Sequence, residues 1–180
     1  MSLKNSNNGY GSVAKLFHWL MFLLLLGAII GGNVESAMAD GQEKYEMILL
    51  HKSFGSLILF LLLARLAWRL LNAQPEQISG PAWQQKAASV VHWLLYLLMF
   101  AQPMSGVLMS QSAGYPVAVF GAFTLPTLVE ESQSLNGVFH EMHEIVWLLL
   151  SAAILIHVAA ALKHHFVNKD ASLRRITWGE

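Results

Sequence analysis

Long apolar runs, and not an alternation of apolar and polar residues, dominate the pattern of this chain. The runs cover about residues 13–32, 47–71, 87–110 and 139–166. Each is close to the roughly 20 residues that an α-helix needs to cross a bilayer. The strands of a transmembrane barrel would instead alternate apolar and polar residues, and these runs do not. The pattern predicts an all-α integral membrane protein, in which residues 1–180 form a single membrane domain built as a four-helix transmembrane bundle.

The first apolar run has a second interpretation. Basic residues, the apolar stretch and the Ala-Met-Ala segment at 37–39 resemble a secretory signal with its cleavage site. We favour a membrane span, because the polar lead-in is long and the apolar core has the length of a span. His18 would also be unusual in a peptide that is removed.

Composition supports a membrane protein and narrows its chemistry. Apolar residues make up 55% of the chain and charged residues 12%, and a formal net charge of zero gives no sign of a nucleic-acid partner. The chain has no cysteine, which excludes thiolate-bound iron–sulfur clusters, covalent c-type haem, cysteine-bound zinc and disulfides. An iron cofactor must therefore be held without covalent attachment, and histidine is the first ligand to consider.

Charge is distributed unequally between the two ends of the predicted bundle. Basic residues gather at one end: Lys4, Lys15, Arg65, Arg69, Lys86, Lys163, Lys169, Arg174 and Arg175. Acidic residues gather at the other: Glu35, Asp40, Glu43, Glu46, Glu130, Glu131, Glu141 and Glu144. Because basic loops stay on the cytoplasmic side, both termini are expected to be cytoplasmic.

Histidines recur inside the apolar runs at two depths. His143 and His157 are fourteen residues apart in the last run, which is nearly four helical turns and ~21 Å of rise on one face. His51 falls at the outer depth of His143, and His18 falls at the inner depth of His157. Because an imidazole within a membrane helix is costly, these histidines are candidates for a functional site.

Paired imidazoles on facing helices suit the axial ligation of haem iron, whereas zinc normally takes three or four protein ligands. The depths therefore predict two haem b groups, one between His51 and His143 and one between His18 and His157. His92 shares the inner depth. It could replace His18 or His157 as a ligand, or it could line a quinone pocket.

Other residues are candidates for supporting roles. Arg65 and Arg69 could pair with propionates of the inner haem, and Lys52 could do so for the outer haem. His164 could bind a quinone carbonyl or a propionate. Gly27, Gly31 and Gly55 offer room for a macrocycle, and the loop at 114–133 is expected to cover the outer site.

Several segments together resemble one family, the bacterial cytochrome b561 family. The segments are Phe17-His18-Trp19-Leu20, Leu50-His51-Lys52-Ser53-Phe54-Gly55, Gln102-Pro103-Met104-Ser105-Gly106, and the spaced His143 and His157 with His164-His165. The resemblance implies a four-helix, di-haem b cytochrome of the bacterial inner membrane that exchanges electrons with quinone. The family's ligand pattern matches His18, His51, His143 and His157. One branch of the family oxidises superoxide and reduces ubiquinone, and there the residue at the position of His164 belongs to the quinone site.

Three functions follow as hypotheses. In the first, electrons pass from an outer donor, for which superoxide is one candidate, through two haems to ubiquinone near His92 and His164. An anionic donor would need local positive charge on an acidic surface, and Lys44 and Lys52 are the candidates. In the second, the chain is a membrane-anchor cytochrome that accepts electrons from a soluble redox partner protein. In the third, the histidines form the relay of a proton-coupled transporter. In each case membrane lipid surrounds the bundle.

Overall fold

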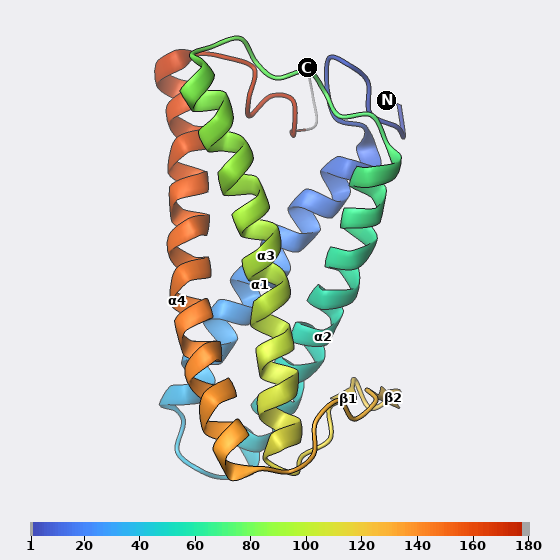
Figure 1. Cartoon of the computed structure of the whole chain (residues 1–180), viewed down its shortest axis with the longest axis vertical. Coiled ribbons are helices and arrows are strands. Elements are labelled where there is room, and N and C mark those ends of the chain that lie inside the picture. The colour runs from blue at the N-terminus through green and yellow to red at the C-terminus, as the bar shows by residue number, and fades with distance from the viewer. Residues whose placement is uncertain (1, 178–180) are drawn as a thin grey trace.

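A computed structural model describes residues 2–177 of the chain, and in this part it is dominated by four long α-helices (Figure 1). These are α1 (Ser12–Ala37), α2 (Gln42–Leu71), α3 (Ala82–Ser112) and α4 (Gln133–Lys163). A π-helical turn, η1 (His164–Asn168), continues α4. A small antiparallel hairpin of β1 (Ala118–Val119) and β2 (Phe123–Thr124) lies between α3 and α4. The all-α membrane bundle predicted from the pattern is confirmed.

Each of α1 to α4 is long and apolar enough to cross a membrane. The helices extend several residues beyond the apolar runs, because backbone hydrogen bonding continues where polar side chains reach the headgroup region. The start of α4 shows how such an end is completed. Ser132 caps this helix, and its side-chain oxygen accepts a hydrogen bond from the Leu135 N–H at 3.4 Å.

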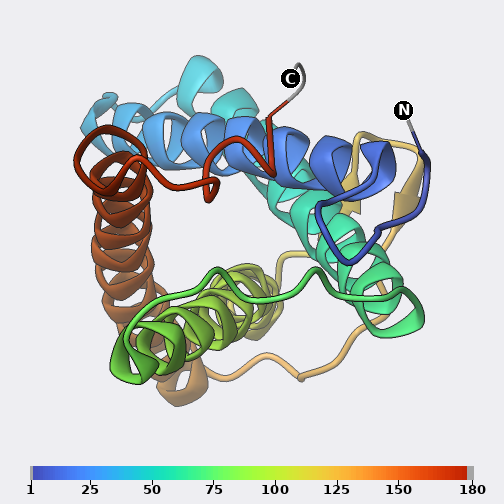
Figure 2. The ribbon, with the colours of Figure 1, turned by 90° about the horizontal axis from the view of Figure 1, so that it is seen from above.

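Viewed along the bundle, the helices form the sides of a quadrilateral, and α1 runs obliquely to the others (Figures 1 and 2). Packing between helices is most extensive between α3 and α4, and then between α1 and α2 and between α2 and α3. All of α1 to α4 contribute to one buried apolar cluster, with Met21, Leu62, Leu98 and Leu150 among its members. Leu150 is seven residues from both His143 and His157, so this cluster separates the two histidine depths.

The terminal segments and the α2–α3 connection are joined by hydrogen bonds at one end of the bundle (Figure 1). Trp19 Nε1 donates to the Ile176 carbonyl at 2.9 Å, and Lys15 Nζ donates to the Thr177 carbonyl at 2.7 Å. Asn5 Nδ2 donates to the Ala73 carbonyl at 2.8 Å. The predicted basic end of the bundle is therefore an ordered layer built from segments far apart in sequence.

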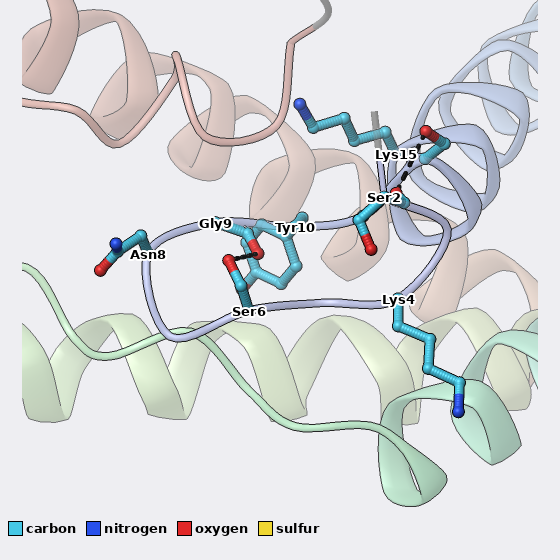
Figure 3. A pocket seen from close by; sticks show the side chains of 9 residues that line it. Ser2, Lys4, Ser6, Asn8, Gly9, Tyr10 and Lys15 are labelled. Carbon is cyan, nitrogen blue, oxygen red and sulfur yellow. Dashed lines mark hydrogen bonds between the residues drawn. The ribbon is translucent and has the colours of Figure 1, made fainter.

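The N-terminal loop in this layer is closed by a short turn, where the Ser6 hydroxyl donates to the Gly9 carbonyl at 3.4 Å (Figure 3). A surface pocket lies against the loop, and its lining includes Lys4, Tyr10 and Lys15. Its lining residues include no histidine. The pocket is thus separate from the histidine pairs inside the bundle.

Candidate cofactor site

The structure brings His51 of α2 and His143 of α4 together near the end of the bundle opposite the termini. Their ring centroids are 6.5 Å apart, with an angle of 79° between the ring planes. Both positions belong to the pair expected at the outer depth. This arrangement joins two helices that are not consecutive in the chain.

Glycines on the neighbouring helices let both outer imidazoles approach a helix backbone. A Cβ atom at Gly32 of α1 would lie 3.1 Å from His51 Cε1, and one at Gly106 of α3 would lie 3.1 Å from His143 Cε1. Sequence reasoning missed Gly32 and instead singled out positions such as Gly27 and Gly55, where an added Cβ would meet nothing within 4 Å. Helix rotation, which sequence spacing does not give, decides which glycine faces a histidine.

The hydrogen bonds around His143 define which of its ring nitrogens carries the proton. The Ser105 hydroxyl has a single proton, which it donates to the Gln102 carbonyl at 2.8 Å. The same oxygen lies 3.0 Å from His143 Nδ1 and must therefore accept the Nδ1–H. His143 Nε2 is then the acceptor nitrogen, in agreement with the Gln102 side-chain amide that lies 3.0 Å from it. Ser105 is fully buried, so water does not compete for these bonds.

The His51 ring has a nitrogen without a hydrogen bond to any group within residues 2–177. Its Nδ1 atom is buried and has no hydrogen-bond partner among the residues that the structure describes. A buried polar atom without a partner is costly, and such atoms often belong to a site that binds another group. The Nε2 atom of His143 and the ring of His51 therefore offer suitable donor atoms to a metal.

Three histidines meet at the inner depth. The ring centroid of His157 on α4 lies 6.2 Å from that of His18 on α1 and 5.4 Å from that of His92 on α3. The pair expected at this depth is thus brought together, and His92 joins it. Geometry alone leaves three imidazoles for a site that needs two axial ligands.

Cationic side chains lie beside this inner group. Arg65 Nη2 is 3.2 Å from His18 Nδ1, and the Arg65 guanidinium lies 5.6 Å from the centre of the Tyr96 ring. Arg69 lies 5.8 Å from the centres of the Tyr96 and Trp93 rings. Tyr96, which sequence reasoning missed, therefore holds both arginines near the inner histidines through contacts of cations with an aromatic face.

His164 begins the π-helical turn after α4, and its hydrogen bonds run toward the C-terminal segment. Its Nδ1 lies 2.5 Å from Asp170 Oδ2 and 3.2 Å from Asn168 Nδ2. Partial burial would raise the pKa of Asp170, but hydrogen bonds from Ser172 and His164 outweigh that effect and lower it. Asp170 was not predicted as a site residue, because an irregular π-helical turn, which has no simple sequence pattern, brings it back to His164.

The remaining predicted residues lie on the outer side. Lys52 Nζ is 5.6 Å from the centre of the Tyr115 ring, which belongs to the α3–α4 connection. Lys44 forms an ion pair with Asp40 at 2.9 Å. The loop predicted to cover the outer site is an ordered hairpin that lies along the flank of α2 (Figure 1).

The histidine pairs have the spacing that a hexacoordinate iron requires. Two imidazoles on opposite sides of one metal atom have ring centroids about 6 Å apart, since each metal–nitrogen bond is about 2.0 Å long. The separations of 6.5 Å and 6.2 Å match this value. In the part of the chain described, no cluster of three or more histidine, cysteine and carboxylate side chains is arranged to hold a metal ion. Two facing imidazoles at this spacing suit a haem iron, whereas a protein-ligated zinc normally takes three or four protein ligands.

Comparison with known proteins identifies the family. The family model described as prokaryotic cytochrome b561 matches residues 9–179, nearly the whole chain. The chain belongs to this family. Membership makes it a multi-pass bacterial membrane protein of the b561 type, which binds haem b and takes part in membrane electron transfer.

Relatives of this b561 chain align over most of their length. Cytochrome b561 homolog 2 of Escherichia coli K12 is 34% identical over 98% of this chain and 95% of its own. Cytochrome b561 homolog 1 of the same organism is 25% identical over 94% of this chain and 97% of its own. A protein of Yersinia pestis named probable superoxide oxidase CybB is 29% identical over 88% of this chain and 90% of its own.

Proposed function

We propose that this b561 protein is a di-haem b cytochrome that carries electrons across the bacterial inner membrane between an outer donor and ubiquinone. The observation that supports this best is the presence of two facing imidazole pairs at two depths, with centroid separations of 6.5 Å and 6.2 Å. Two cofactors are needed because one macrocycle cannot bridge a hydrocarbon core of about 30 Å.

In this proposal His51 and His143 would hold the outer haem, and His18 and His157 would hold the inner haem. The inner choice rests on spacing, because the 5.4 Å between His92 and His157 is shorter than the span of two imidazoles across one metal. Haem held by these pairs would supply one-electron redox chemistry.

The side chains around the ligands prepare these sites. The Ser105 hydroxyl holds the proton of His143 on Nδ1, which leaves Nε2 as the metal-binding atom. To hold a haem iron, this nitrogen would have to exchange its contact with the Gln102 amide. At the inner depth, the Arg65 guanidinium donates to His18 Nδ1. If His18 held haem through Nε2, its Nδ1 would carry the proton and could no longer accept from Arg65. The Arg65 guanidinium would then be available, with Arg69, to pair with haem propionates. Lys52 is the corresponding cation at the outer haem.

Quinone is proposed to react at the inner end, beside His92 and His164. His92 is next to the inner ligand His157, and His164 lies seven residues further along the same helical face. His164 Nδ1 is hydrogen bonded to the Asp170 carboxylate. Asp170 therefore orients an imidazole that lies where a reduced quinone could exchange a proton with it. The basic residues at this end support a cytoplasmic location for both termini.

The two redox hypotheses differ in the electron donor on the outer side. Superoxide is the leading candidate, because the Yersinia relative is named a probable superoxide oxidase. A soluble redox protein is the second candidate, since Lys44 is paired with Asp40 and leaves the outer surface mainly acidic. Family membership supports electron transfer over the proton-coupled transporter.

The experiment is a pyridine haemochrome assay with a protein determination on the purified chain. We expect two haem b groups per chain, and one after either His51→Ala or His143→Ala. His140→Ala is the matched control, because His140 is one turn from His143 but has a 58% exposed side chain near Glu144. Retention of both haems in the His51 and His143 variants would contradict the ligand assignment.

The inner ligands and the donor are tested in the same way. His18→Ala should lose one haem, whereas His92→Ala should keep both and slow ubiquinone reduction. The reverse result would make His92 the ligand. Reduction of ubiquinone by the purified protein with superoxide alone supports the first donor, and a requirement for a soluble protein supports the second.

A further inference from the structure

The connection between α3 and α4 has the composition of a membrane-embedded segment. Residues 113–129, with the sequence AGYPVAVFGAFTLPTLV, contain no charged side chain. Large apolar side chains in it are nevertheless exposed, with Phe120 and Phe123 each 51% and Leu128 56% accessible. A loop with these side chains in water would present an apolar surface that aqueous loops normally avoid.

The hairpin in this connection is attached to α2 through one buried side chain. Ser53 is 4% exposed. Its oxygen accepts the N–H of Phe120 at 3.0 Å and lies 3.3 Å from the Ala118 carbonyl. Phe120 has a φ of 49°, a backbone conformation that bulky residues seldom adopt. The hydrogen bond to Ser53 helps to hold it, so the position of the hairpin against α2 is specified.

Aromatic contacts extend the hairpin along the outer flank of α2. Phe120 packs on Phe54 with ring centroids 5.3 Å apart, and Phe123 packs on Phe60 at 6.2 Å. Phe60 is eight residues after Lys52 in α2, about 12 Å of helical rise toward the middle of the span. Phe60 is itself 42% exposed, so the exposed rings of the hairpin continue the lipid-facing surface of α2. Figures 1 and 2 show the hairpin outside the helical quadrilateral, beside α2.

We propose that this hairpin is a lipid-contacting element that inserts its aromatic turn among the acyl chains of the outer leaflet. Hydrogen bonding limits how deep it goes. On the side facing α2, Ser53 accepts the Phe120 N–H, but a two-stranded sheet also has an outer edge whose backbone groups need water or headgroups. The exposed backbone edge of the hairpin is therefore expected at the boundary of headgroups and acyl chains, with the aromatic side chains directed toward the acyl chains.

The test uses the absence of native cysteine, because Phe123→Cys creates a unique site for a nitroxide label. The full-length labelled protein is placed in proteoliposomes of phosphatidylethanolamine and phosphatidylglycerol. The collision rates of the label with lipid-soluble oxygen and with a water-soluble nickel chelate are then measured. Leu155→Cys is the lipid-facing control, since Leu155 is 70% exposed within α4. Asp40→Cys is the aqueous control, since its side chain is 97% exposed between α1 and α2.

We expect the label at position 123 to collide with oxygen far more often than with nickel, with a ratio closer to that at position 155 than to that at position 40. A ratio like that at position 40 would place the hairpin in water and overturn the proposal. Low collision rates with both reagents would also overturn it, because they would indicate cover by a protein, such as a second copy of the chain. Phe120→Cys provides a second label position at which the same collision ratio is measured. Size-exclusion elution like that of the unsubstituted chain shows that each variant is folded.

Discussion

Ser105 has one hydroxyl proton, and the group that accepts this proton determines which ring nitrogen of His143 is protonated. Because the proton goes to the Gln102 carbonyl, the Ser105 oxygen accepts from His143 Nδ1. The other nitrogen, Nε2, faces the Gln102 amide and is the one that would bind metal. A ring nitrogen that donates to such a partner makes its imidazole a more basic ligand. At the scale of single residues, Ser105 is therefore a positioning residue that can tune the proposed outer haem without touching it.

Replacing Ser105 by alanine should raise the midpoint potential of one of the two haems, because a less basic ligand stabilises ferric iron less. The potential of the other haem should not change. Spectroelectrochemical titration measures both values in a variant that still holds two haems. Ser105→Thr keeps the hydroxyl oxygen and should restore the original potential. If both potentials are unchanged in the alanine variant, the hydrogen bond has no such role.

At the scale of elements, the outer site depends on how closely α3 approaches α4. Gly106 lies on α3, and a Cβ atom there would be 3.1 Å from the His143 ring. This distance is shorter than an ordinary van der Waals contact. The helix or the imidazole would therefore have to shift by a few tenths of an ångström. Gln102, which is four residues before Gly106, forms hydrogen bonds with both Ser105 and His143. One turn of α3 therefore supplies the groups that surround the His143 imidazole.

Gly106→Ala should weaken retention of the outer haem, giving roughly a tenfold faster loss for each 1.4 kcal/mol of strain placed on the ligand. Transfer of haem to excess apomyoglobin, followed by absorbance, measures this rate. Gly27→Ala is the control in α1, because a Cβ there would meet nothing within 4 Å. Equal rates in the two variants would show that the Gly106 contact does not constrain His143.

At the scale of the whole molecule, one apolar cluster connects α1 to α4 and separates the two histidine depths. Leu150 lies in its centre and is 2% exposed. Because it is seven residues from both His143 and His157 along α4, its main contribution is expected to be packing between helices. Residues on the lipid face contribute less, since an acyl chain can fill the space that a shortened side chain leaves.

Leu150→Ala should therefore lower the stability of the bundle by about 2–5 kcal/mol, the usual range for removing a buried leucine side chain. Leu155→Ala is the matched control on the lipid-facing side of the same helix. Thermal unfolding in detergent, followed by circular dichroism, should show a clearly lower transition temperature only for the Leu150 variant. Equal transitions would mean that the cluster does not hold the bundle together.

The sequence by itself determined the membrane spans, the depths of the histidines and the family motifs. Hydrocarbon thickness imposes the length of each apolar run, and the helical rise converts the spacing of His143 and His157 into two depths. The tertiary structure decided which side chains meet at each depth. Helix tilt and rotation decide that His92 packs beside His157 and that Gly32 lies against His51. An irregular turn brings Asp170 back to His164. These features arise from packing between neighbouring segments, which a pattern read along one chain does not contain.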